Sequence, residues 1–358
     1  MAAPRADERP VPQGLVPFWG GSLAAFATLE PVAFDRGTQE RHRAYSLLLM
    51  AIMSARWNGN KYGEVGDYGT WRENQLLTTG TDGTKVYAGG SYLGHNIAAI
   101  AVDATGRVID FEFNHNDLFD SSVEHAESRL VRRVFALNQV YSPWSEGGPV
   151  ESQSAGPPHQ LFTTAVSQPD QLGGQAEVVR GYSSLLTDVT IYTSLESCAQ
   201  CSGIMTLAGV RQIVYLQWDQ GEFLVGNMMY KATAGGASGF RAPLPVPAAA
   251  FGFEYFDQLN AGNDAFCAGV TSSPFYTGPA TTGPVTTPSI TSYLCTDDAQ
   301  GIYAAAAAEL TTFSVADPTY VPPGSPRGTL SNAGVLAEVT RFHEYATAIA
   351  NRGTPHRV

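Results

Sequence analysis

Charged residues are scarce in this sequence, and basic ones are scarcer than acidic ones. Only 15% of the 358 residues are Asp, Glu, Lys or Arg, and 21 basic side chains stand against 33 acidic ones, for a formal net charge of -12. A chain with this balance repels polyanions as a whole, so any contact with nucleic acid must be local. The 44% hydrophobic content is still enough for one large domain or two ordinary ones.

Long apolar runs are also missing. The most apolar run, Leu47 to Met53, is far too short to span a bilayer, and residues 1 to 14 have no apolar stretch of signal-peptide length. We therefore expect no membrane partner and a cytoplasmic location. Four cysteines are too few for a disulfide scaffold, and two of them form Cys198-x-x-Cys201, which in a reducing compartment indicates metal or redox chemistry.

The first half of the chain alternates between helical and strand-like segments. Apolar residues recur at three- and four-residue spacing over Arg41 to Arg56, which predicts a helix whose apolar face needs a sheet to cover it. Residues 57 to 93 are dense in Gly, Asn, Asp and Thr and predict turns with a hairpin. Two antiparallel strands are expected at Ile97 to Val102 and Val108 to Phe113, followed by a helix from Val123 to Asn138.

A second alternation follows after a break. Clustered Gly and Pro at residues 141 to 180 are typical of a loop or insertion. β-Branched and aromatic residues predict a strand at Asp188 to Thr193, then a helix at Cys198 to Ala208 and a strand at Arg211 to Leu216. This β-α-β order implies parallel pairing with a right-handed crossover.

These patterns divide the chain into three regions. Residues 1 to 37 form an irregular leader rich in Pro and Gly, and residues 38 to 232 form the main domain, which contains the insertion. Residues 233 to 358 are rich in Gly, Ala, Pro and Thr, notably at Ala242 to Pro247, and predict an irregular and helical extension packed on the core, or a small accessory domain. Its expected helices lie at Phe251 to Leu259, Tyr303 to Leu310 and Gly334 to Asn351.

Two short segments, each at the start of an expected helix, carry residues suited to metal chemistry. They are Glu124-His-Ala-Glu-Ser128 and Ser194-Leu-Glu-Ser-Cys-Ala-Gln-Cys201. His125 and Glu127 lie where the chain is not yet committed to helical periodicity, so both side chains can reach one pocket. Cys198 and Cys201 are three apart, so on a first helical turn both thiolates point at one metal, and the helix N-terminus stabilises their charge.

One imidazole and two thiolates suit Zn²⁺ and leave its fourth tetrahedral position for water, as in catalytic zinc sites. Zinc lowers the pKa of such a water to about 7, and a carboxylate beside the metal can move its proton to a leaving amine. Glu127 is placed for that role. A structural zinc knot would need a fourth protein ligand, and no second Cys-x-x-Cys or His pair lies nearby in the sequence. A thioredoxin-type site would need no His-Glu partner.

The two segments together resemble the cytidine and deoxycytidylate deaminase superfamily, whose signature is H-x-E followed by P-C-x-x-C. They are similar in particular to the branch with tRNA adenosine, guanine and deoxycytidylate deaminases. That branch has Thr or Ser, then Leu-Glu-Pro-Cys-x-x-Cys, with Gly and Met just after. The matching residues here are Ser194, Leu195, Glu196, Cys198, Cys201, Gly203 and Met205. The resemblance covers roughly residues 38 to 232.

The sequence departs from the family at Ser197, where a proline is usual. In relatives the carbonyl of that residue lies beside the reacting amino group, and Ser retains a carbonyl but not the rigidity of proline. The stretch from His125 to Cys198 is also longer than the family norm, and the expected insertion accounts for the excess. Asn114, at the end of an expected strand, matches an Asn that similar proteins place there to hold the sugar or base.

The resemblance implies an α/β fold, a three-layer α/β/α sandwich with a mixed central sheet and Zn²⁺ at the N-termini of the two motif helices. It also implies a hydrolytic deaminase of a cytosine- or adenine-type base that releases ammonia. The zinc ligands would be His125, Cys198 and Cys201, and the catalytic acid and base would be Glu127. The residues implied to bind substrate are Asn114, Ala126 and Ser197.

The sequence leaves alternatives for the substrate class and for the roles of several residues near the two motifs. The acidic balance favours a free base, nucleoside or nucleotide, and the alternative is a nucleic-acid-editing or toxin-type deaminase acting on single strands. A catalytically silent zinc module that mediates protein contacts is the competing class, and a homo-oligomer is also open. Arg129, Arg132 and Arg133 meet a substrate phosphate or form a solvated helix face, and His95 and His115 touch substrate or are solvated or hydrogen-bonded.

Overall fold

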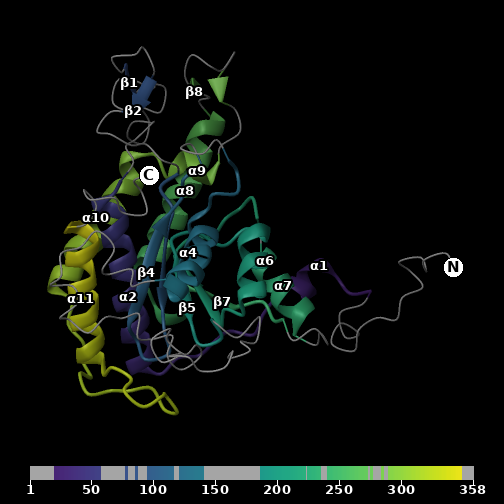
Figure 1. Cartoon of the computed structure of the whole chain (residues 1–358). Helices are drawn as coiled ribbons and strands as arrows, with labels where there is room; N and C mark the ends of the chain where they lie inside the picture. Colours follow the sequence, from purple (N-terminus) through teal and green to yellow (C-terminus); the bar gives the residue numbers. More distant parts are fainter. Residues whose placement is uncertain are drawn as a thin grey trace.

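A computed structural model of the chain describes residues 20–57, 95–116, 121–140, 186–222, 224–234, 240–272 and 289–348, with the short strands 77–79, 85–87, 275–276 and 284–285 (Figure 1). The expected insertion at 141 to 180 and residues 1 to 19 of the expected leader lie outside the described residues. The hairpin expected within 57 to 93 is present as β1 (Leu77–Thr79) and β2 (Lys85–Tyr87), which pair antiparallel.

A mixed sheet of five strands forms the centre of the described fold, in the order β4-β3-β5-β6-β7. β3 runs antiparallel to both β4 and β5, whereas β5, β6 and β7 run parallel to one another. The antiparallel pair and the parallel β-α-β unit expected from the sequence are therefore confirmed. The strands are β3 (Ala98–Val102), β4 (Val108–Phe113), β5 (Thr190–Thr193), β6 (Gln212–Tyr215) and β7 (Leu244–Pro247).

The helix expected at Arg41 to Arg56 is α2 (Arg36–Ala55). It begins earlier than expected because Asp35 caps it by accepting a hydrogen bond from the backbone N–H of Thr38 at 2.9 Å. α2 packs on β3 and β5, and α10 (Asp297–Thr312) and α11 (Asn332–Ala348) pack on α2 in turn (Figure 1). Because it is covered by the sheet and by other helices, every residue from Ala44 to Met53 is buried.

The helix expected at Val123 to Asn138 is α4 (Ala126–Val140). It lies with α6 (Ala199–Ala208) on the face of the sheet opposite α2 (Figure 1), and it packs on β3, β4 and α6. Side chains alternate along β4 accordingly. The ring of Phe111 meets that of Phe342 in α11 with centroids 5.8 Å apart, whereas Asp110 forms an ion pair with Arg133 of α4. β4 therefore faces helices on both sides.

The central sheet extends beyond residues 38 to 232, the region that the sequence analysis assigned to the main domain. β7 lies within Ala242 to Pro247, a stretch whose composition had indicated irregular chain, and the backbone N–H of Leu244 donates to the carbonyl of Arg211 at 3.1 Å. Pro245 and Pro247 donate no hydrogen bond, but β7 is an edge strand in the described sheet, where proline is tolerated. The fold of the site's sheet thus depends on residues beyond 232.

Helices after β7 complete the core. Their buried residues belong to the same hydrophobic cluster as those of the sheet and α2. The helix expected at Phe251 to Leu259 is longer than predicted, and a short helix interrupts the expected leader. The remaining elements are α1 (Leu23–Ala27), α7 (Val225–Thr233), a 3-10 turn at Ala248–Phe251, α8 (Glu254–Ser272), β8 (Phe275–Tyr276), β9 (Pro284–Val285) and α9 (Ile290–Tyr293).

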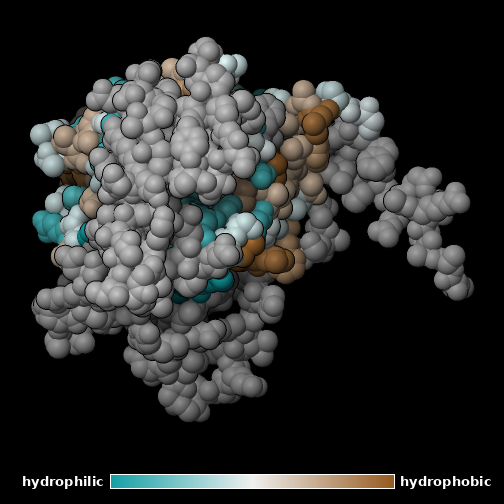
Figure 2. Space-filling model, turned by 90° about the horizontal axis from the view of Figure 1, so that it is seen from above, coloured by the Kyte–Doolittle hydropathy of each residue, from teal (hydrophilic) through white to brown (hydrophobic). Residues whose placement is uncertain are grey.

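The described surface has one side richer in hydrophobic residues. Seen from above, these residues gather toward the side on which α6 and α7 lie (Figure 2). Leu207 of α6 is 58% exposed, and Leu23 of α1 is 68% exposed.

Among the described helices, none combines the length and the apolar character that crossing a bilayer requires.

Truncating a core side chain of α11 tests whether the C-terminal helices are part of one cooperative fold. Phe342 is fully buried against Phe111 of the sheet, so we expect Phe342→Ala to lower the free energy of unfolding by about 3–5 kcal/mol. Chemical denaturation measures this change, with Thr340→Ala on the exposed side of the same helix as the control. A loss below about 1 kcal/mol would show that α11 is dispensable for the core.

Candidate metal centre

The end of β4 places His125 and Glu127. The backbone N–H of Ala126 donates to Oδ1 of Asn114 at 2.7 Å, which ties the start of α4 to the residue that follows the strand. The carbonyl of His125 accepts the backbone N–H of Arg129 at 3.0 Å and so begins the helical hydrogen-bond pattern. His125 therefore lies at the N-terminal boundary of α4, and Glu127 lies in its first turn.

The end of β5 places the two cysteines. Cys198 is the N-cap residue of α6, and its sulfur accepts a hydrogen bond from the backbone N–H of Cys201 at 3.4 Å. Glu196 braces the segment just before the helix, because its carboxylate accepts the backbone N–H groups of Asp219 at 3.2 Å and Leu224 at 3.1 Å. Both cysteines consequently lie on the first turn of a helix that starts at a fixed point.

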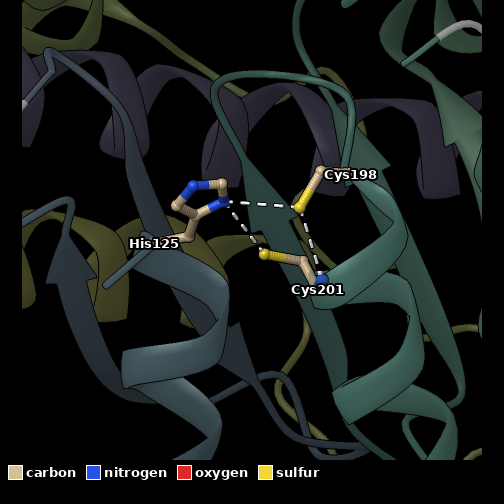
Figure 3. A group of neighbouring side chains, drawn as sticks. All are labelled: His125, Cys198 and Cys201. Carbon is tan, nitrogen blue, oxygen red and sulfur yellow. Dashed lines mark hydrogen bonds between the residues drawn. The ribbon is translucent and has the colours of Figure 1, made fainter. Parts of the chain in front are cut away.

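Three side chains converge between these two helix N-termini (Figure 3). Nδ1 of His125 lies 3.3 Å from Sγ of Cys198 and 3.5 Å from Sγ of Cys201, and the ligand atoms of all three lie within 4.8 Å of one another. In the part of the chain that the structure describes, no fourth His, Cys, Asp or Glu side chain joins this group. The structure thus brings together the three residues that the sequence indicated as metal ligands.

The spacing of this group fits zinc. Tetrahedral zinc with Zn–N bonds of about 2.0–2.1 Å and Zn–S bonds of about 2.3 Å separates a ligating nitrogen from a ligating sulfur by about 3.5 Å. The two nitrogen-sulfur distances at His125, 3.3 and 3.5 Å, agree with that separation. An imidazole and two thiolates are also donors that Zn²⁺ prefers. These residues are suited to hold zinc with one position left for a ligand from outside the chain.

The carboxyl group of Glu127 lies beside this group and is buried, with 3% of the residue exposed. Oε2 of Glu127 is 3.5 Å from Sγ of Cys201, and Oε1 accepts a hydrogen bond from the hydroxyl of Ser197 at 2.8 Å. Burial, followed by the negative charge of Cys198, raises the pKa of Glu127 above its usual value of 4.5. A carboxyl group with a raised pKa exchanges protons more readily near neutral pH than an ordinary glutamate does.

The two thiols of the centre differ in acidity in the metal-free protein. A hydrogen bond from the thiol of Cys201, followed by one with His125, lowers the pKa of Cys198 to about 4. The same contact with Cys198, together with burial, holds the pKa of Cys201 well above its usual value of 9.0. Cys198 is therefore the thiolate of the pair at neutral pH.

This difference predicts selective alkylation. In metal-free protein at pH 6, iodoacetamide should modify Cys198 roughly tenfold faster than Cys267, whose pKa is raised by burial, because the larger thiolate fraction outweighs the lower nucleophilicity of a low-pKa thiol. From pH 6 to 8 the rate at Cys198 should stay flat while that at Cys267 rises. Peptide mass spectrometry measures both rates, and zinc should protect Cys198. A rate at Cys198 that climbs with pH like an ordinary thiol would contradict the assignment.

The three residues expected to bind substrate surround the same group. Asn114 and Ala126 are buried and bind each other, which leaves the amide nitrogen of Asn114 for other contacts. Ser197 is 4% exposed and directs its hydroxyl at Glu127. Each has an internal contact that holds it next to the centre, and their contact with substrate stays a prediction.

The arginines of α4 form ion pairs with carboxylates. Arg132 lies on an exposed part of the helix, whereas Arg129 and Arg133 are largely covered, and contact with a substrate phosphate stays a prediction. Of the three, only Arg132 has a side chain more than half exposed, at 52%. The neighbouring His115 is fully buried, and burial lowers its pKa to about 3, so it is neutral at physiological pH. The ion pairs are Arg129 with Glu112 and Glu124, Arg132 with Glu124, and Arg133 with Asp110.

Sequence reasoning missed the carboxylates that follow β6. Oε2 of Glu222 accepts the backbone N–H of Ala199, the first residue of α6, at 3.4 Å, and Asp219 is close enough for Cys198 to raise its pKa, although burial is the larger cause. Glu196 was marked by the resemblance but received no role. Nothing in the local sequence distinguishes Glu222, because its contact joins the segment after β6 to the start of α6. These residues make the surroundings of the centre acidic.

Comparison with known proteins gives a slight likeness to deaminases. No family model and no curated protein matches the chain. A solved structure from a study of tRNA:A34 deaminases, which carry out A-to-I editing at the wobble position, is 17% identical with a TM-score of 0.24 and covers 44% of this chain and 80% of its own. A guanine deaminase from Nitrosomonas europaea is 15% identical with a TM-score of 0.26 and covers 65% of this chain and 91% of its own. Likenesses at this level do not establish a family.

Proposed function

We propose that this protein is a zinc-dependent hydrolytic deaminase that removes an exocyclic amino group from a nucleobase. One geometric observation supports the proposal above all. Nδ1 of His125 and the sulfur atoms of Cys198 and Cys201 are spaced as the ligands of a tetrahedral zinc ion are. The buried carboxyl group of Glu127 lies 3.5 Å from Sγ of Cys201. Three protein ligands and an adjacent carboxyl group are what a hydrolytic zinc enzyme needs. We propose also that the chain has the three-layer α/β/α sandwich of the superfamily that its motifs resemble.

The residues of the chain divide the work of such a reaction. When bound, zinc supplies a Lewis acid that lowers the pKa of a water molecule to about 7. Glu127 would accept one proton from the attacking water and deliver it to the ring nitrogen while the oxygen bonds to the amino-bearing carbon. It would then move the second proton from that oxygen to the amine, so that the C–N bond breaks, ammonia departs and a carbonyl remains. Asn114 orients the base or sugar, and the backbone at Ala126 and Ser197 holds the amino group near Glu127.

We propose further that the substrate is small: a free base, nucleoside or nucleotide. The charge near the centre favours this choice, because Glu222 and Asp219 lie close to Cys198 and the α4 arginines are paired with carboxylates. A nucleic-acid strand is held mainly by cations that contact its phosphates. The net charge of -12 points the same way.

An ammonia-release screen tests the proposal. Zinc-loaded protein is offered bases, nucleosides, nucleotides and single-stranded oligonucleotides, with Glu127→Ala as the control and bound zinc measured in parallel. Ammonia from a small substrate, lost in the variant and insensitive to salt, is the expected result. If only oligonucleotides are turned over, at a rate that falls steeply with salt, the protein would instead be a nucleic-acid-editing deaminase. One bound zinc without turnover of any substrate would identify a silent scaffold instead.

A further inference from the structure

The hydroxyl of Ser197 contacts Glu127 across 70 residues of sequence. Its Oγ lies 2.8 Å from Oε1 of Glu127, a normal length for an O–H···O hydrogen bond. Both residues are buried, so water does not compete for either group. A hydroxyl that donates to a carboxylate forms one of the stronger hydrogen bonds in proteins. The proline usual at this position in the resembled superfamily has no hydroxyl, so the contact depends on the serine of this chain.

The two oxygens of Glu127 have different surroundings. Oε1 accepts the hydroxyl of Ser197 at 2.8 Å, whereas Oε2 lies on the side of the His-Cys-Cys group and, in the metal-free protein, accepts a weaker hydrogen bond from the thiol of Cys201 at 3.5 Å. The last torsion of a glutamate side chain has only a broad preference, so without a partner the carboxylate plane rotates over a wide range. A hydrogen bond to one oxygen restricts this rotation and fixes where the other oxygen lies.

Ser197 is itself held on both sides. The backbone N–H of Glu196 donates to the carbonyl of Gln217 at 2.8 Å, and the Glu196 carboxylate accepts two further backbone N–H groups. On the other side, the carbonyl of Cys198 accepts the backbone N–H of Ser202 at 2.9 Å and begins α6. The hydroxyl is therefore presented by a braced strand-to-helix junction, whose position does not depend on Glu127.

We propose that Ser197 is the positioning residue for Glu127: its hydroxyl holds Oε1, so that Oε2 is the oxygen that receives and delivers protons beside the metal group. The catalytic meaning of this assignment rests on the proposed deaminase function, whereas the contact does not require the metal. Ser197 replaces, by a side-chain hydrogen bond, some of the rigidity that proline would give to the turn. Because the hydroxyl is not a metal ligand, its loss should spare zinc binding.

The activity test uses the full chain loaded with zinc. Ser197→Ala should lower kcat by about ten- to a hundredfold, part of what a positioned acid-base group contributes, with KM changed less than about twofold. Ser197→Thr, which keeps the hydroxyl, should recover most of kcat. Ser202→Ala is the matched control, because Ser202 is equally buried on α6 and makes no contact with Glu127 among the hydrogen bonds described. Wild-type kcat in Ser197→Ala, or a loss that Thr does not rescue, would overturn the proposal.

A second measurement needs no activity. In metal-free protein, Ser197→Ala should lower the melting temperature by a few degrees, and the same change in a Glu127→Ala background should have almost no effect, since the partner is already gone. Equal shifts in both backgrounds would mean that the two residues do not interact. Ser197→Gly serves if Ala does not fold. If the wild-type protein turns over no substrate, the deaminase function fails, while this cycle still decides whether Ser197 holds Glu127.

Discussion

Replacing Cys198 with serine is expected to abolish zinc binding and ammonia release without disturbing the helix that carries the residue. Sγ of Cys198 is 3.3 Å from Nδ1 of His125 and supplies one of the three ligands of the candidate centre. Cys198 is also the N-cap residue of α6. Serine is a preferred N-cap residue but a poor zinc ligand, so the substitution separates these two roles.

Three measurements test the effect of Cys198→Ser: bound zinc, turnover and the melting temperature with added zinc. Bound zinc should fall from one equivalent to near zero, and turnover should fall by about a thousandfold or more, because activation of water by the metal is lost. Added zinc should raise the melting temperature of the wild-type protein and leave that of Cys198→Ser unchanged, as expected when a ligand binds only the folded state. Cys267→Ser, outside the group, should behave like the wild type. Stoichiometric zinc in Cys198→Ser would show that the metal is held elsewhere.

The residues of the centre could be found in the sequence because each pair is local. His125 and Glu127 lie at the start of one helix, Cys198 and Cys201 at the start of another, and hydrophobic periodicity located both helices to within a few residues. The strands that precede these helices and pair beside them, β3 to β6, were also predicted from local residue patterns. Zinc chemistry then required the two pairs to meet, and the structure places them within contact distance.

The parts that the sequence did not reveal depend on contacts between distant segments. β7 contains Pro245 and Pro247, which argue against a strand unless it lies at a sheet edge, and its position is known only once β6 is in place. The packing of Phe342 on Phe111 likewise joins the last described helix to the β3-β4 hairpin in the first third of the chain. Composition gives no sign of either pairing. The hydrogen bond from Ser197 to Glu127 belongs to the same class, since it crosses between the two motifs.

Replacing Glu127 with glutamine is expected to remove turnover while leaving the metal group and the fold in place. Glutamine has nearly the same shape, and its side-chain oxygen can still accept the hydrogen bond that Ser197 donates at 2.8 Å. It cannot take up a proton from water. We therefore expect kcat to fall by about a thousand- to ten-thousandfold, the upper range for loss of a general acid-base group, with one equivalent of zinc still bound.

The same variant should also show a characteristic dependence of stability on pH in metal-free protein. Burial raises the pKa of Glu127 in the folded state above 4.5, so as pH rises past that value the unfolded state loses its proton first and is favoured. Glu127→Gln carries no such cost. Its melting temperature relative to the wild type should therefore increase as pH rises above 4.5 and level off once the folded carboxyl group is ionised, with Glu254→Gln, on an exposed side chain, as the control. A variant that keeps wild-type turnover, or whose relative stability falls over this pH range, would show that Glu127 is neither the proton carrier nor a buried acid with a raised pKa.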